Sequence, residues 1–115
     1  MAIQTAVQKE NLAIAYGTNA TYAALYTTAP GGTAGTEPSG GSPAYARKAL
    51  TWVPGSSDGV NAVTVTFDVP AGATIVGAGV HTAITAGTYL DGGSVTSQAF
   101  ASQGTYALTL TYTQS

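Results

Sequence analysis

The sequence predicts an all-β fold with one helix at its N-terminus. Apolar and polar residues alternate along residues 60–69 and 105–113, which is typical of strands with one buried face. Short runs of this kind recur every eight to twelve residues or so, separated by turns rich in Gly and Pro. No helical segment lies between them, so the βαβ units of a parallel sheet are not expected. We therefore expect one antiparallel β-sandwich domain over residues 1–115, jelly-roll or immunoglobulin-like.

The helix is expected at residues 2–16. Ile3, Val7 and Ile14, with Ala6 and Ala13 between them, recur at spacings near three, four and seven, as on one face of a helix. Gly17 follows directly, where a residue able to adopt positive φ commonly ends a helix. Because Val7 and Ile14 are weak helix formers, pairing of this segment as a strand is the alternative. Residues 1–17 are thus interpreted as an N-terminal helix or arm.

Six or seven short strands should follow the helix. Residues 60–69 are the clearest, because Val63, Val65, Phe67 and Val69 share one face. The turn at residues 70–73 should fold the next strand back as an antiparallel hairpin, since Pro and Gly favour a tight reversal. The other expected strands are 21–28, 44–52, 74–82, 87–90, 94–100 and 105–113, with turns at 54–59 and 91–93.

Residues 29–42 are expected to form a long loop. Gly, Pro, Thr and Ser dominate this stretch, so it has few apolar side chains to bury. Long loops in compact domains are often contact surfaces. A contact surface and a plain connector both remain open for this loop.

The composition narrows the class of function. Charged residues make up 7% of the chain, against about 25% in an average soluble domain. A surface with few charges gives little electrostatic repulsion between copies of a protein. A place in a repetitive assembly is therefore expected. The net charge of −2 gives no basic face for nucleic acid. No stretch has the length of a membrane span, and no basic region precedes a hydrophobic core, so synthesis in the cytoplasm without a cleaved signal is expected.

The residues that could carry chemistry are scattered. The absence of Cys and the presence of a single His, His81, leave too few ligands for a transition-metal site. No two carboxylates are singled out as an acid and base pair, and those in Gly-rich loops are interpreted as solvated turn residues. The acids are Glu10, Glu37, Asp58, Asp68 and Asp91. We therefore expect no enzyme activity, no cofactor and no metal.

Residues 42–52 form the most distinctive stretch. They hold two of the three cations, Arg47 and Lys48, and the one Trp of the chain. The cations either contact an acidic surface on a neighbouring subunit or protect an edge strand from pairing. The seven Tyr residues fit a core or subunit interface, with a sugar-binding platform as the alternative. The candidate partner contacts are Ile3, Val7, Tyr45, Arg47, Lys48 and Trp52.

This stretch also carries a family resemblance. Residues 41–48, 51–52, 67–72 and 87–89 resemble those of small virion proteins from phages of actinobacteria, which are labelled tail fibre-like or minor structural proteins. The similarity covers nearly the whole chain. It implies a non-enzymatic structural role on the outer surface of the phage particle.

The resemblance leaves the place in the virion open. A separate tail fibre usually has a shaft, a coiled coil or repeats, and the sequence shows none of these. A capsid decoration protein that stabilises the capsid subunits is therefore the first interpretation, and a tail fibre or receptor-binding tail protein is the alternative. The expected partners are other virion proteins, either the major capsid protein or tail proteins. A homo-oligomer, such as a trimer, is expected from this type of protein.

Overall fold

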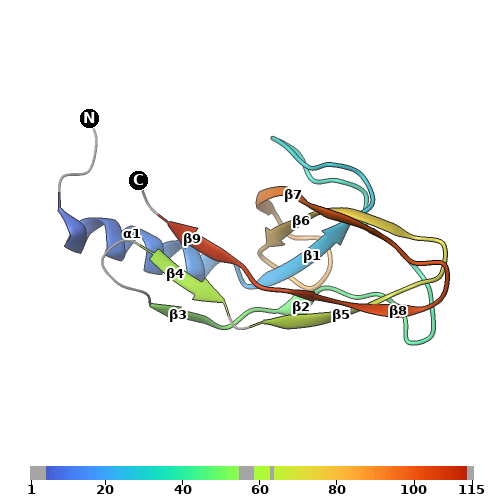
Figure 1. The fold of residues 1–115 in the computed structure, drawn as a ribbon. Coiled ribbons are helices and arrows are strands. Elements are labelled where there is room, and N and C mark those ends of the chain that lie inside the picture. Colours follow the sequence, from blue (N-terminus) through green and yellow to red (C-terminus); the bar gives the residue numbers. More distant parts are fainter. Residues whose placement is uncertain (1–4, 55–58, 63, 114–115) are drawn as a thin grey trace.

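The computed structural model describes residues 5–54, 59–62 and 64–113. Ile3, Asp58 and Val63 lie outside these ranges, as does most of the turn expected at residues 54–59. The molecule is elongated, with principal extents of 48 × 25 × 24 Å. Figure 1 shows the helix and a small sheet at one end and the larger part of the β-structure at the other. The elements are α1 (Ala6–Asn19), β1 (Tyr22–Tyr26), β2 (Lys48–Ala49), β3 (Trp52–Pro54), β4 (Gly59–Ala62), β5 (Val65–Val69), β6 (Thr74–His81), β7 (Tyr89–Ala99), β8 (Gly104–Leu108) and β9 (Thr111–Thr113).

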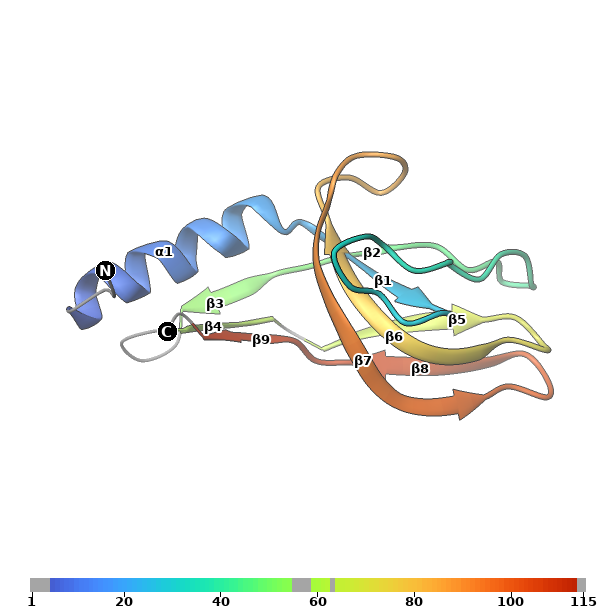
Figure 2. The same cartoon turned by 90° about the horizontal axis from the view of Figure 1, so that it is seen from above.

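The strands form three antiparallel sheets. The largest has the order β2-β1-β6-β7, a second has the order β3-β4-β9, and β5 pairs with β8. The first sheet packs over the β5–β8 pair, while α1 lies along β3, β4 and β9 (Figure 2). The prediction of an all-β, sandwich-like fold with an N-terminal helix is confirmed.

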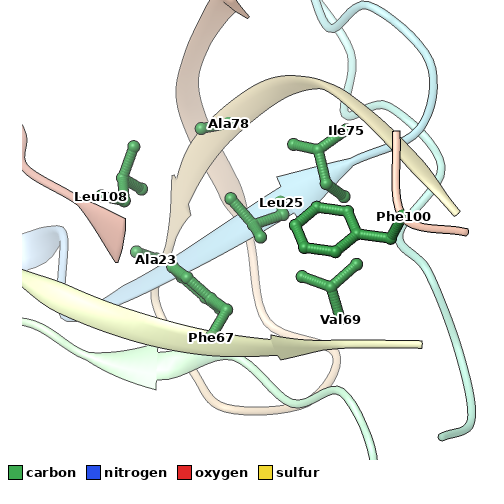
Figure 3. Packing of buried hydrophobic residues seen from close by; sticks show 8 residues of the cluster. All are labelled: Ala23, Leu25, Phe67, Val69, Ile75, Ala78, Phe100 and Leu108. Atoms are coloured by element: carbon green, nitrogen blue, oxygen red, sulfur yellow. The ribbon is translucent and has the colours of Figure 1, made fainter. Parts of the chain in front are cut away.

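The core lies between the four-stranded sheet and the β5–β8 pair (Figure 3). Leu25, Phe67 and Ile75 are fully buried there, and burying side chains of this size is the main source of stability. Alternate residues of β5 point into the core, as the sequence pattern predicts. The cluster comprises Ala23, Leu25, Phe67, Val69, Ile75, Ala78, Phe100 and Leu108.

The helix forms as predicted but extends further. Thr5 caps its start, because the Thr5 hydroxyl accepts a hydrogen bond from the backbone N–H of Gln8. Gly17 does not end the helix, which continues to Asn19. A Cβ atom at Gly17 would lie 2.8 Å from Cγ of Trp52. The position therefore requires glycine for close packing rather than for a turn.

The expected hairpin between residues 60–69 and 74–82 is wrong. β5 pairs with β8, and β6 pairs with β1 and β7. Both segments have a buried apolar face, and these faces meet across the core instead of lying side by side in one sheet. Gly72, with φ at 86°, turns the chain, and its N–H donates to the carbonyl of Phe100 over 2.6 Å.

Two expected long strands are each divided. Residues 60–69 become β4 and β5, and residues 105–113 become β8 and β9. Asn61 pairs with Thr111, whereas Val65 pairs with Leu108. Three residues (62–64) lie between β4's Asn61 and β5's Val65, whereas only two (109–110) lie between their partners Leu108 and Thr111. An extra residue on one strand disrupts regular pairing and bends the ribbon.

Two further expectations about strands are wrong. Residues 91–93 do not form a turn, because β7 runs through them and pairs with β6. Of residues 44–52, only Lys48–Ala49 and the first residue of β3 lie in strands. The side chains of Tyr45 and Arg47 bind loops instead, as described below.

The loop at residues 29–42 covers the outer face of the four-stranded sheet. Pro30 lies against Gly77, where a Cβ atom would be 2.5 Å from Cδ of Pro30. The Tyr89 hydroxyl donates to the carbonyl of Gly31 over 2.8 Å. Backbone N–H of Thr27 also donates to the carbonyl of Thr36. Tyr26 is consequently fully buried although it lies on the face opposite the core.

Candidate partner-binding surfaces

The helix presents an exposed, uncharged stripe with two apolar side chains at one end of the molecule. Val7 is 73% exposed and Ile14 is 42% exposed, and a separation of seven residues puts them on the same stripe. Asn11 and Thr18, which are also exposed, lie on this stripe. Ala13, by contrast, is buried. A shallow depression of about 370 Å³ beside the stripe is lined by Ala6, Val7, Glu10 and Asn11.

Trp52 joins the helix to the strands. Its indole Nε1 donates to the carbonyl of Ala20 over 2.7 Å. Its ring meets Tyr16 edge-to-face at 5.7 Å between centroids. The Tyr16 hydroxyl in turn donates to Oδ2 of Asp91 on β7 over 3.0 Å. The helical end is thus fixed to the large sheet through specific contacts.

A cleft of about 390 Å³ lies between the loop at residues 29–42 and the β6–β7 loop. Glu37 and Arg47 form an ion pair in it, with Nη2 and Oε2 2.8 Å apart. The Tyr45 hydroxyl donates to Oε1 of Glu37, also over 2.8 Å, and the Tyr45 ring stacks on Phe67. The lining residues are Glu37, Pro38, Tyr45, Ala46, Arg47, Ile84, Thr85 and Ala86.

Arg47 holds the two loops together. Its Nη1 donates to the carbonyls of Ala83 and Ala86, over 3.0 and 2.8 Å. Its Nε and Nη2 donate to Glu37 in the opposite loop. Ala86 has φ at 53°, a region that residues with a side chain seldom adopt. By binding the carbonyl of Ala86, Arg47 therefore stabilises this unfavourable backbone conformation of the β6–β7 loop.

The ion pair sets the charge of this cleft. Burial alone would raise the pKa of Glu37, but hydrogen bonds from Arg47 and Tyr45 outweigh it and hold the pKa below its ordinary value. The hydrogen bond to Glu37 raises the pKa of Arg47 despite partial burial. Burial raises the pKa of Tyr45. The carboxylate and the guanidinium are both charged at neutral pH and neutralise each other.

An aromatic cluster near the ion pair consists of the buried Tyr26 and His81 and the half-buried Tyr89. The Tyr26 hydroxyl and Nε2 of His81 are 2.5 Å apart, and His81 is only 3% exposed. The Tyr89 ring lies 5.6 Å from the His81 ring and 6.3 Å from the Tyr26 ring. Burial, together with the charge of Arg47, lowers the pKa of His81, against a smaller opposing effect of Glu37.

We expect the protein to lose stability as the pH falls below the ordinary histidine pKa of 6.5. The unfolded chain binds a proton at His81 more readily than the folded chain, so acid favours unfolding. Urea unfolding followed by circular dichroism, between about pH 7.5 and pH 5, measures this effect. The variant His81→Gln should show a smaller decline over the same interval. Equal pH dependence in both proteins would contradict the prediction.

The structure separates the candidate contact residues from one another. Val7 is exposed on α1, and Trp52 is half-buried at the base of the same helix. Tyr45 and Arg47 bind within the chain at the cleft. Lys48 is half-buried in β2, and Ile3 is not among the described residues. Contact of these residues with a partner remains a prediction.

Neither a metal site nor a membrane-spanning helix is found among the residues that the structure describes. Within them, no cluster of three or more His, Cys, Asp or Glu residues could hold a metal ion. The described helix is too short and too polar to cross a membrane.

A comparison with known families decides the class of protein. The family model of the podophage GP4 fiber I protein gp80 matches residues 10–111. The chain belongs to this family. The match includes most of α1, the cleft, the strands β1 to β8 and the first residue of β9. No curated protein and no solved structure matches the chain.

Membership of the gp80 family makes the chain a bacteriophage structural protein of the fibre type, with a place in the virion. Such a protein is structural rather than enzymatic. The family description favours the tail fibre alternative over capsid decoration. An origin in phages of actinobacteria stays a prediction.

In this gp80-family chain, sequence reasoning missed the role of Glu37. Its interpretation as a solvated turn residue is wrong, because the side chain is only 26% exposed and pairs with Arg47. The available signal was a lone acid in a Gly- and Pro-rich loop, ten residues before a lone Arg. Sequence separation alone does not show that two such charges meet.

Proposed function

We propose that the chain is a subunit of the tail fibre that attaches to neighbouring virion proteins through the exposed stripe of α1. The other end, which contains the sandwich core, then points away from the attachment and toward the bacterial surface. The expected partners are tail proteins or further copies of this chain. The assembly role is structural and needs no cofactor.

The exposure of Val7 and Ile14 on α1 is the observation that supports this proposal. The helix lies at one end of an elongated molecule, and its stripe contains no charged residue. Exposed apolar surface is a common mark of a protein interface. Covering two such side chains stabilises an assembly without a charged partner, because each removes apolar area from water.

The location within the particle can be measured on intact phage. Gold-labelled antibody against this chain, viewed by electron microscopy, should mark the tail. Labelling over the whole capsid surface would overturn the proposal and favour capsid decoration. An unrelated antibody and a phage that lacks the gene are the controls.

The attachment surface can be tested separately. Val7→Ser combined with Ile14→Ser should strongly reduce the copy number of the chain in purified particles, because the partner loses its apolar contact. The stability of the isolated protein should change by less than about 1 kcal/mol, since both side chains are exposed. Quantitative mass spectrometry of particles measures the copy number.

A matched control exists on the same molecule. Val53 is 51% exposed and Leu90 is 40% exposed, and neither lies on α1. Val53→Ser combined with Leu90→Ser should be incorporated like the unchanged protein. Equal incorporation of the α1 variant and this control would show that the stripe is not the attachment surface.

A further inference from the structure

The cleft between the two loops has properties that the attachment role does not use. Its volume of about 390 Å³ is within the range of small-molecule sites. It shares no residue with the α1 stripe, because its walls are formed by residues 37–38, 45–47 and 84–86. A ligand could therefore occupy it while the helix is bound to a partner.

The cleft holds one ion pair between largely apolar walls and carries no net charge. Glu37 is 26% exposed and Arg47 is 11% exposed, and their charges cancel within one ion pair. The bonds of Arg47 to other described residues leave one N–H of Nη2 available. Because neither charge is unpaired, a charged ligand would gain little. A ligand with several hydroxyl groups suits such a pair, since hydroxyls both donate and accept.

The rim of the cleft adds apolar contacts. Ile84 is 51% exposed, and Pro38 lines the same cleft. Thr85 adds an exposed hydroxyl beside them. The C–H face of a sugar ring is apolar, whereas its edge carries hydroxyls, so the ring could contact Ile84 and the ion pair together.

We propose that this cleft binds an uncharged saccharide, with Glu37, Arg47 and Thr85 contacting its hydroxyls and Ile84 its ring face. The inference deepens the proposed function and rests on it for the bacterial surface as the source of the sugar. The cleft residues themselves are positioned without a ligand. Arg47 binds both loops, and Tyr45 fixes Glu37, so binding does not have to order these side chains.

Solution NMR with simple sugars tests the proposal. The probes are the methyl glycosides of glucose, galactose, mannose, rhamnose and N-acetylglucosamine, added one at a time to the ¹⁵N-labelled full chain. At least one should cause saturable shifts of the backbone amides around residues 37, 45–47 and 84–86. Glucuronate should bind more weakly than the uncharged sugar of the same stereochemistry.

Variants locate the binding residues. Ile84→Ser should weaken binding of the responding sugar by about fivefold, because it removes an apolar contact at the rim. Thr85→Ala should weaken binding by a similar factor, because it removes a hydroxyl that contacts the ligand. Val53→Ser, at a residue that is also 51% exposed, should leave binding unchanged. These exposed substitutions should leave the fold intact, which the remaining amide spectrum verifies.

Several outcomes would overturn the proposal. These are the absence of saturable shifts with all five glycosides, shifts confined to residues outside the cleft, and equal weakening by Ile84→Ser and Val53→Ser. The location of the chain in the virion is measured on particles and does not depend on sugar binding. A failure of the saccharide site is therefore distinguishable from a failure of the tail fibre role.

Discussion

Replacing Gly79 by alanine is expected to destabilise the fold by about 3 kcal/mol. A Cβ atom there would lie 2.6 Å from the Tyr26 hydroxyl and 2.8 Å from the backbone carbonyl oxygen of Asp91. Tyr26 cannot move away, because it is fully buried between the sheet and the covering loop. Its hydroxyl also contacts His81. Urea unfolding measures the loss of stability directly.

Gly93→Ala provides the control for this prediction. Gly93 lies in β7 beside the same glycine-rich part of β6, and a Cβ atom there would have no neighbour within 4 Å. This substitution should be neutral or stabilise by up to about 1 kcal/mol, since it reduces the freedom of the unfolded chain. Similar effects at Gly79 and Gly93 would show that close packing on Tyr26 is not what requires glycine.

Replacing Arg47 by alanine is expected to cost about 2 to 3 kcal/mol of stability. The change leaves the partly buried Glu37 carboxylate without its cation and removes the donor to the carbonyls of Ala83 and Ala86. Because Glu37 is partly exposed, water can hydrate its unpaired carboxylate. The loss of stability is therefore smaller than for a fully buried ion pair. Amide hydrogen exchange should increase in the β6–β7 loop.

Two comparisons test this explanation. Lys48→Ala removes the neighbouring cation, which has no ion pair among the described residues, and should change stability by less than about 0.5 kcal/mol. The double variant Arg47→Ala, Glu37→Ala should be less destabilised than the sum of the single variants, because no unpaired charge remains. Additive effects of the two single changes would argue against the ion pair as the source of the cost.

The local part of the fold could be predicted from sequence. The periodicity of Val7 and Ile14 indicates a helix, and the alternation along residues 65–69 and 105–108 identifies which side chains enter the core. These features depend on neighbours within a few residues, which the sequence displays directly. The low fraction of charged residues likewise predicts that the protein is part of a larger assembly, which agrees with membership of a phage fibre family.

Only the tertiary structure decided which strands pair and which polar groups meet. The pattern of β5 and β6 fits a hairpin and a pair of facing sheets equally well, because both arrangements bury the same alternate residues. The meeting of Glu37 with Arg47 depends on how two loops cross. The need for glycine at position 79 depends on Tyr26, which lies 53 positions earlier in the chain. The sequence therefore determined the helix and the buried faces of β5 and β8. Long-range packing decided the cleft, since its walls come from segments far apart along the chain.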